Sequence, residues 1–150
     1  MSSVMKRIVC VSASVLLVAG VVGSSPVRAQ QTGVAARDAW VRVPAPSKDE
    51  TAMYVILENH SAQRRAVVAV SSEAAAKAEM HEMKMNDKMM GMSPVAEIAV
   101  PANGKTELRP NGLHIMLFGL KTRPAVGDTV HATLTLDDGS TLPITATVRK

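Results

Sequence analysis

The sequence has 150 residues and a formal net charge of +4, from 17 Lys and Arg against 13 Asp and Glu. This length is typical of one domain that can bury a real core. The only aromatic residues are Trp40, Tyr54 and Phe118, which excludes an aromatic core and leaves Val, Ile, Leu, Ala and Met to build it.

The first 29 residues predict a secretory signal peptide. Two basic residues precede an uncharged, mainly apolar run (Ile8–Gly23), and the segment ends at Ala29, a small residue suited to cleavage. The run has 16 residues, fewer than the roughly 20 that a membrane-spanning helix needs. We expect residues 1–29 to be removed and residues 30–150 to form a single domain in the periplasm. A retained N-terminal anchor is the alternative.

Removal of this segment would change two global properties. The mature chain would lose three basic residues and no acidic ones (Lys6, Arg7 and Arg28), which leaves 14 basic and 13 acidic residues and a charge near +1. That charge argues against binding to nucleic acid or to an anionic membrane surface. The chain would also lose Cys10, its one cysteine, which excludes disulfides, thiolate metal ligands and cysteine nucleophiles.

The rest of the chain predicts short strands separated by turns. The segments with strand composition are 35–43, 51–58, 65–72, a strand from about Lys77, 95–100, 105–108, 113–120, 130–136 and 141–148. Residues 72–80 have helical propensity, but a helix there would be short and poorly amphipathic, so we predict a turn that leads into a strand. We expect one hairpin from 51–58 and 65–72, and another from 130–136 and 141–148. This pattern indicates an all-β, antiparallel β-sandwich.

Two histidines and six of the ten methionines lie between His81 and Met116. Strand alternation places His81 and Met83 on one face of the strand from Lys77, while Met80 faces the other way. The return strand of the hairpin at 84–92, whose tip we place at Asn86-Asp87, carries Met92.

A second pair of potential ligands, His114 and Met116, has the same i, i+2 spacing on a later strand. Two such pairs on neighbouring strands can converge on one ion, with Met92 reaching it from the hairpin. Thioethers and imidazoles suit a soft ion such as Cu(I), and thioethers bind it without losing a proton. Methionine cannot form disulfides, so these ligands stay available in an oxidising compartment.

The segment from 81 to 92 reads HEMKMNDKMMGM, with five methionines in twelve residues. Exposing so many thioethers in a polar loop has no packing rationale, and their oxidation would be a hazard. A methionine-rich protein-binding surface is the chief competing interpretation. By contrast, we assign Met53 and Met80 to the core, His60 to a turn and His131 to an outward strand position.

At these residues the chain resembles the PCu(A)C family of periplasmic copper chaperones, whose signature is H-x10-M-x21-H-x-M. His81, Met92, His114 and Met116 match it at all three spacings, and the likeness extends to the AWVR segment that begins at Ala39. The resemblance implies a cupredoxin-like, Greek-key β-sandwich that binds one Cu(I) through these four residues. The surplus methionines lie outside the signature, and we infer from their chemistry alone that they are auxiliary ligands (Met83, Met85, Met89 and Met90).

The resemblance also implies a role in copper homeostasis and cytochrome c oxidase assembly. The expected acceptors are the CuA centre in subunit II of cytochrome c oxidase and a Sco-type thiol protein. Cu(II) is a second candidate ion. We expect a monomer that is not an integral membrane protein after processing.

Four other functions compete with copper delivery. An exported enzyme needs a catalytic constellation, and Glu79 and Glu82 beside His81 form no recognisable one, so we predict that the chain is not an enzyme. A blue-copper electron carrier needs a cysteine thiolate, which the mature chain lacks. A methionine-rich interaction module, or a copper storage or tolerance protein without an oxidase target, remains the alternative.

Overall fold

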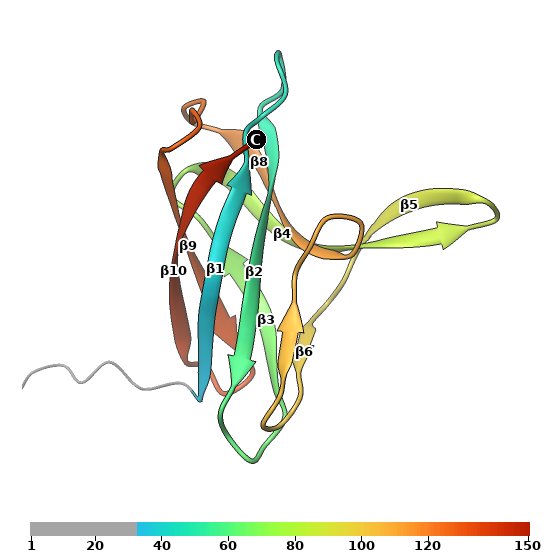
Figure 1. Cartoon of the computed structure of the whole chain (residues 1–150), viewed down its shortest axis with the longest axis vertical. Coiled ribbons are helices and arrows are strands. Elements are labelled where there is room, and N and C mark those ends of the chain that lie inside the picture. Colours follow the sequence, from blue (N-terminus) through green and yellow to red (C-terminus); the bar gives the residue numbers. More distant parts are fainter. Residues whose placement is uncertain (1–32) are drawn as a thin grey trace, which may run out of the picture.

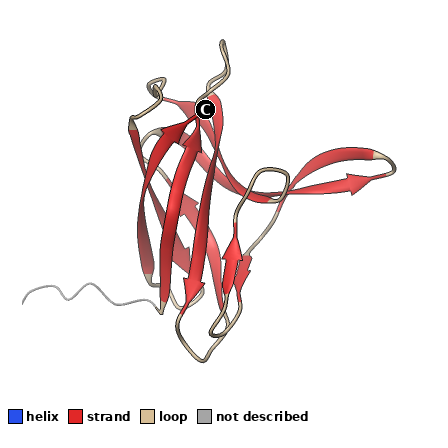
Figure 2. Ribbon diagram, viewed as in Figure 1, coloured by secondary structure: helices blue, strands red, loops and turns tan. Residues whose placement is uncertain are grey.

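The computed structural model describes residues 33–150, so the signal peptide predicted for 1–29 lies outside the described residues. Within 33–150 every regular element is a strand (Figure 2). In chain order the strands are β1 (Val34–Arg42), β2 (Glu50–Asn59), β3 (Arg65–Ser71), β4 (Ala75–Asn86), β5 (Met89–Pro94), β6 (Ile98–Val100), β7 (Lys105–Glu107), β8 (Leu113–Leu120), β9 (Thr129–Leu136) and β10 (Thr141–Arg149). The described part of the chain thus offers no helix long and apolar enough to cross a membrane.

The strands form a folded-over sheet in the order β5-β4-β8-β2-β1-β10-β9-β3-β6, with β7 added beside β2. Its two halves pack face to face, and β10, β1 and β2 run side by side across the front of Figure 1. The all-β sandwich is therefore confirmed. The prediction of purely antiparallel pairing is wrong at one place, because β1 runs parallel to β10.

This parallel contact arises because β1 belongs to both halves of the sandwich. It pairs with β2 along most of its length, with a register shift between Arg37 and Trp40. Asp38 lies in that shift with a positive φ of 48°, which bends the strand as a bulge does. Beyond the bend, Trp40 to Arg42 also pair with β10, so the bulge lets β1 close one edge of the sandwich.

The predicted hairpin of 51–58 with 65–72 is wrong. The segments do form β2 and β3, but β2 pairs with β1, β7 and β8, whereas β3 pairs with β6 and β9. The buried side chain of Asn59 explains the crossing, because its amide donates hydrogen bonds to the carbonyl oxygens of Gln63 and Val100 at 2.7 and 3.2 Å. These bonds tie the connection to the end of β6 instead of allowing a tight turn. The hairpin of β9 and β10 is confirmed.

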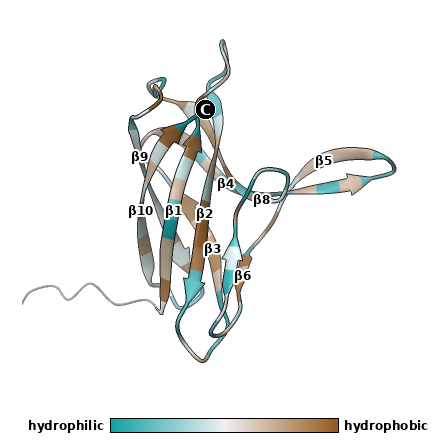
Figure 3. Ribbon diagram, in the orientation of Figure 1, coloured by the Kyte–Doolittle hydropathy of each residue, from teal (hydrophilic) through white to brown (hydrophobic). Residues whose placement is uncertain are grey.

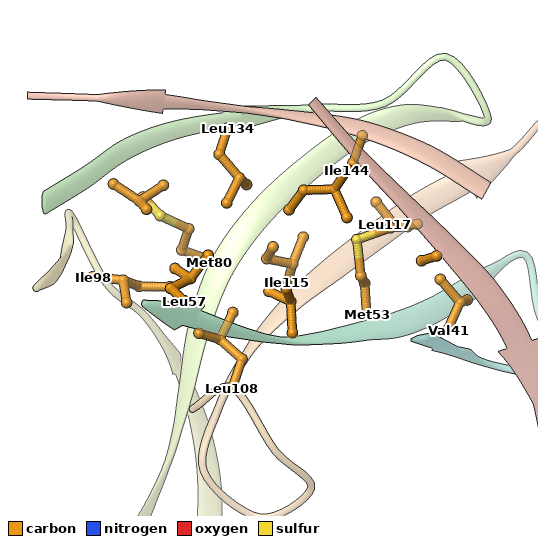
Figure 4. Close-up of a cluster of buried hydrophobic side chains, with 14 of the residues drawn as sticks. Val41, Met53, Leu57, Met80, Ile98, Leu108, Ile115, Leu117, Leu134 and Ile144 are labelled. Atoms are coloured by element: carbon orange, nitrogen blue, oxygen red, sulfur yellow. The ribbon is translucent and has the colours of Figure 1, made fainter. Parts of the chain in front are cut away.

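The core fills the space between the two halves of the sandwich (Figure 4). Met53 and Leu57 of β2, Ile115 and Leu117 of β8 and Met80 of β4 are all at most 6% exposed. The core roles predicted for Met53 and Met80 are therefore confirmed. Burying each such side chain stabilises the fold by about 1.5–3 kcal/mol, which fixes the strands that carry the candidate ligands.

The hairpin of β4 and β5 extends away from the sandwich (Figure 1). The first part of β4 pairs with β8, from Ala75 to Glu82, whereas its last residues pair with β5 alone. The hairpin turns at Asp87 and Lys88, both with positive φ (42° and 77°), as a two-residue type I′ turn requires. The tip therefore lies one residue later than the predicted Asn86-Asp87. Figure 3 shows hydrophilic and weakly apolar residues along this arm.

Candidate metal centre

β4 and β8 bring the two predicted histidines side by side. Their antiparallel register places His81 directly opposite His114. Met80 and Ile115, the next pair along, point into the core. Because alternate residues of a strand face opposite ways, His81, His114 and Met116 share the other face of the sheet. The ring centroids of the two histidines are 6.0 Å apart.

The fourth residue of the signature reaches this face from β5. Met92 lies directly opposite Met83, which is two residues beyond His81 and so faces the same way. The Sδ atom of Met92 lies 3.2 Å from Nε2 of His114. All four residues of the signature are thus on one face of the three strands β5, β4 and β8.

The ring of His114 is oriented so that a lone pair faces this sulfur. Its Nδ1 lies 2.9 Å from the carbonyl oxygen of Gly112, and because a carbonyl only accepts, Nδ1 carries the proton in the neutral ring. Nε2 then presents its lone pair toward Met92. Tetrahedral bonds of about 2.0 Å to nitrogen and about 2.3 Å to sulfur, the lengths found for Zn²⁺, would hold the two atoms about 3.5 Å apart. The observed separation is close to that value.

His81 has one nitrogen paired and one free. Its Nε2 lies 3.0 Å from Oε2 of Glu79, whose other oxygen is 2.6 Å from Nζ of Lys77. The hydrogen bonds from Lys77 and, secondly, from His81 lower the pKa of Glu79, so it remains a carboxylate that accepts the Nε2 proton. Nδ1 of His81 is buried without a hydrogen-bond partner. Burying a nitrogen lone pair without a hydrogen-bond partner costs free energy of desolvation. This lone pair is available to a metal ion.

Aromatic residues cover the histidine pair. The rings of Tyr54 and Phe118 lie 6.4 Å from His114 and 6.0 Å from His81 respectively, and Trp40 packs on Tyr54 at 4.5 Å. The histidines are accordingly only 5–6% exposed, although they lie on the face away from the core. Burial raises the pKa of the Tyr54 hydroxyl, an effect that Arg42 partly offsets.

This aromatic cover was not predicted from the sequence. Phe118 lies four residues after His114 on β8, so strand alternation alone would have placed the two on one face. Tyr54 and Trp40 reach the site only through the register of β2 with β1 and β8, which no local pattern reveals. All three aromatic residues of the chain therefore pack around the candidate site and not in the core cluster.

The surplus methionines lie farther out on the hairpin. Met83 is half-buried beside Met92, whereas Met85, Met89 and Met90 are 66%, 75% and 47% exposed. Met89 lies opposite Asn86, so alternation places it on the other face of the hairpin from Met83, Met85 and Met90.

The donor set of this site is soft. In the described residues 33–150, no three His, Cys, Asp or Glu side chains are grouped as a hard or borderline metal ion would require. The two remaining histidines lie elsewhere and are exposed, His60 beside Glu58 and His131 beside Thr145, in the turn and the outward strand position that the sequence predicted. Imidazole and thioether donors together favour Cu(I) over Mg²⁺, Ca²⁺ or Mn²⁺.

The fold and the site together define an all-β sandwich domain with a histidine and methionine centre at one edge. The chain matches the family model described as "LpqE-like: Putative lipoprotein LpqE-like" over residues 34–148. It is 32% identical over 121 residues to "Putative lipoprotein Lxx21020" of Leifsonia xyli subsp. xyli, an alignment that covers 80% of this chain and 72% of that protein. The chain therefore belongs to the LpqE-like family.

Solved structures of related proteins confirm the resemblance drawn from the signature. The "Solution structure of CuI-DR1885 from Deinococcus Radiodurans" is 38% identical, covers 75% of each chain and superposes with a TM-score of 0.60. The "Copper-bound PCuAC domain from PmoF2" is 18% identical, covers 78% of this chain and 92% of that one, and has a TM-score of 0.66. This second likeness shows the fold alone. The predicted cupredoxin-like β-sandwich is thereby confirmed.

Proposed function

We propose that this chain is an extracytoplasmic, non-enzymatic copper carrier that binds one Cu(I) ion through His81, Met92, His114 and Met116. The observation that carries the proposal is the lone pair of His114 Nε2 facing the Met92 sulfur at 3.2 Å. The relative from Deinococcus radiodurans, solved with Cu(I), supports the choice of ion. Cu(II), a harder ion, would gain less from two thioethers.

The two histidines would use different nitrogens. His114 is poised to bind through Nε2, because Gly112 holds its Nδ1 proton. His81 would bind through its buried, unpartnered Nδ1, while Glu79 accepts the proton of Nε2. A carboxylate on the far nitrogen of a ligating histidine fixes the tautomer and raises the basicity of the ring. Glu79 is therefore a positioning residue in this proposal.

Release would begin at Met92. This side chain is 45% exposed, whereas Met116 and the two histidines are at most 8% exposed. A neutral thioether on the outer strand is the ligand that a cysteine or histidine of an acceptor can replace first. The ion would then pass through a shared intermediate as Cu(I), without a change of oxidation state. The proposed acceptors are the CuA centre in subunit II of cytochrome c oxidase and a Sco-type thiol protein.

The family supports an extracytoplasmic location for the protein. The matching family and the relative from Leifsonia xyli are both described as lipoproteins, which supports an extracytoplasmic protein. We assign the chain to the periplasm as a monomeric domain spanning residues 30–150, after removal of a signal peptide at 1–29. Methionine ligands suit that oxidising compartment, since they form no disulfides.

Titration with Cu(I) against a chromophoric competitor tests the proposal. The wild type should hold one equivalent tightly, and His114→Ala and Met116→Ala should both lose it. His131→Ala is the matched control, because this exposed histidine lies on β9 outside the site. Full binding in His114→Ala, or equal loss in His131→Ala, would contradict the proposed ligands. Transfer to a soluble CuA domain of subunit II, followed by its absorbance, tests the proposed acceptor.

A further inference from the structure

We propose that the hairpin carries a second Cu(I) site, made only of thioethers, that collects the ion and transfers it to the site described above. We call that site, made of His81, Met92, His114 and Met116, the inner centre. The ligands of the second site are Met83, Met85 and Met90, and Met92 links it to the inner centre. We call these four residues the methionine ladder. The collecting role rests on the proposed function, whereas binding to the ladder can be tested separately.

The register of the hairpin places the four sulfurs on one face. Met83 lies opposite Met92, and Met85 lies opposite Met90. Met83 and Met85 are two residues apart on β4, and Met90 and Met92 are two residues apart on β5. All four side chains therefore point to the same side as His81. The ladder is therefore a continuation of the face that carries the inner centre.

The hydrogen-bonding phase brings the methionines of each pair as close as antiparallel strands allow. The backbone N–H of Met83 donates to the carbonyl oxygen of Gly112, at 3.2 Å, on the side away from β5. Met83 and Met92 therefore form a non-hydrogen-bonded pair, in which the Cα atoms are about 4.5 Å apart instead of about 5.5 Å. Met85 and Met90, two residues further on, have the same phase. Long, unbranched methionine side chains at this spacing can bring their sulfurs to one ion.

The two faces of the hairpin differ in chemistry. The opposite face carries Lys84 and Glu82, joined by an ion pair of 3.0 Å, with Ser93 beside them and Met89 next to the turn. On the ladder face Met85, Met90 and Met92 are 45–66% exposed, so packing does not account for them. A docking surface would be served equally well by leucine or valine, yet the large apolar side chains of this arm are all methionine. Of these three residue types only methionine contains sulfur, and a thioether is a ligand that soft metal ions prefer. The composition therefore favours a soft ion as the occupant.

Met92 connects the two sites. It lies opposite Met83 of the ladder, and its sulfur lies 3.2 Å from His114 Nε2 of the inner centre. An ion bound to Met92 can exchange the thioether of one other ladder methionine for the nitrogen of His114. In this step a Cu–S bond breaks and a Cu–N bond forms, while copper stays Cu(I). No proton moves, because the proton of His114 is on Nδ1.

Titration of the full chain, labelled with ¹³C at the methionine methyls, with Cu(I) under anaerobic reducing conditions tests this proposal. The first equivalent should shift the methyl signals of Met92 and Met116. The second should bind more weakly and shift those of Met83, Met85 and Met90, leaving the signal of core Met53 unchanged. Absence of a saturable second equivalent in the wild type would overturn the proposal, and would be the result if the hairpin only docks a protein.

Leucine variants separate sulfur chemistry from apolarity. Met85→Leu with Met90→Leu keeps the size and apolar character of the pair, and should weaken the second equivalent by about tenfold or more while the first is retained. Met89→Leu is the matched control on the other face and should change neither. Unchanged binding of the second equivalent in the double variant, or loss of the second equivalent in Met89→Leu, would overturn the proposal. His114→Ala should keep the ladder while the first equivalent is lost, so failure of the inner centre and failure of the ladder are distinguishable.

Discussion

The histidine pair and the methionine ladder lie on one continuous face, yet they differ in how firmly the fold holds them. His81 and His114 are 5–6% exposed beneath an aromatic cover, and each has a ring nitrogen held by a named acceptor. The outer methionines project from an arm that only two strands support. This contrast suggests that the buried nitrogens determine affinity, while the exposed sulfurs determine how the ion enters and leaves.

Removing a nitrogen ligand should have the largest effect. We expect His81→Ala to weaken Cu(I) binding by more than about a hundredfold, beyond the range typical for losing an outer partner of a ligand. Met92→Leu should cost clearly less, because an exposed ladder methionine can substitute for the lost sulfur. Competition titrations of both variants measure the difference. Equal losses would break the proposed division between buried and exposed ligands.

Glu79 should have the next largest effect. Replacing it with alanine leaves the Nε2 proton of His81 without its acceptor, and affinity for the first equivalent should fall by about 10–100-fold. Glu79→Gln, which still accepts a hydrogen bond, should recover part of the loss. Glu82→Ala is the control, since this neighbour lies on the other face and pairs with Lys84. If Glu82→Ala lowers the affinity for the first equivalent as much as Glu79→Ala does, the loss is a general effect of charge and not of the hydrogen bond to His81.

The two sites should also respond differently to pH. Histidine must be neutral to bind a metal, so protons compete with Cu(I) for the ring nitrogens as the pH falls. Binding of the first equivalent should therefore be weaker at pH 5 than at pH 8. The thioethers of the ladder do not titrate, so the second equivalent should be insensitive to pH. If the first equivalent binds equally well at pH 5 and pH 8, the histidines are not ligands.

The smallest effect concerns the tip of the arm. Lys88 has a φ of 77°, where a side chain is unfavourable and glycine is not. Lys88→Gly should therefore stabilise the hairpin, by up to about 1 kcal/mol, and slow hydrogen exchange in β5 without changing Cu(I) affinity. Lys84→Gly, in the strand interior, should do the reverse. Faster exchange in Lys88→Gly would show that the turn is held by something other than its backbone conformation.

Local patterns predicted the elements better than their partners. The strand at 113–120 coincides with β8, because its apolar run is bounded by the turn before His114. The partner of β2 could not be predicted, since Asn59 diverts the chain through contacts with Gln63 and with Val100, 41 residues away. The parallel contact of β1 with β10 is also non-local, and it depends on a bulge at Asp38 that a single aspartate within a strand segment does not predict.

The candidate site shows the same limit. Spacing and the family signature predicted which four residues would share a face, because i, i+2 periodicity is a local property. The roles of Glu79 and of the aromatic cover could not be predicted, since they depend on ring orientation and on the register between β1, β2 and β8. The phase of hydrogen bonds in the hairpin, which brings the ladder methionines together, likewise depends on which side of β4 faces β8.

X-ray absorption at the copper edge, on the complex with one equivalent of Cu(I), tests the central claim most directly. We predict two nitrogen and two sulfur neighbours in the wild type, and sulfur neighbours alone in His114→Ala, where the ion binds only to the ladder. In Met92→Leu both nitrogens and two sulfurs should remain, because a ladder methionine replaces the lost thioether. In the wild type, a first shell with sulfur alone, or with nitrogen and oxygen alone, would contradict the assignment of His81, Met92, His114 and Met116 as the ligands.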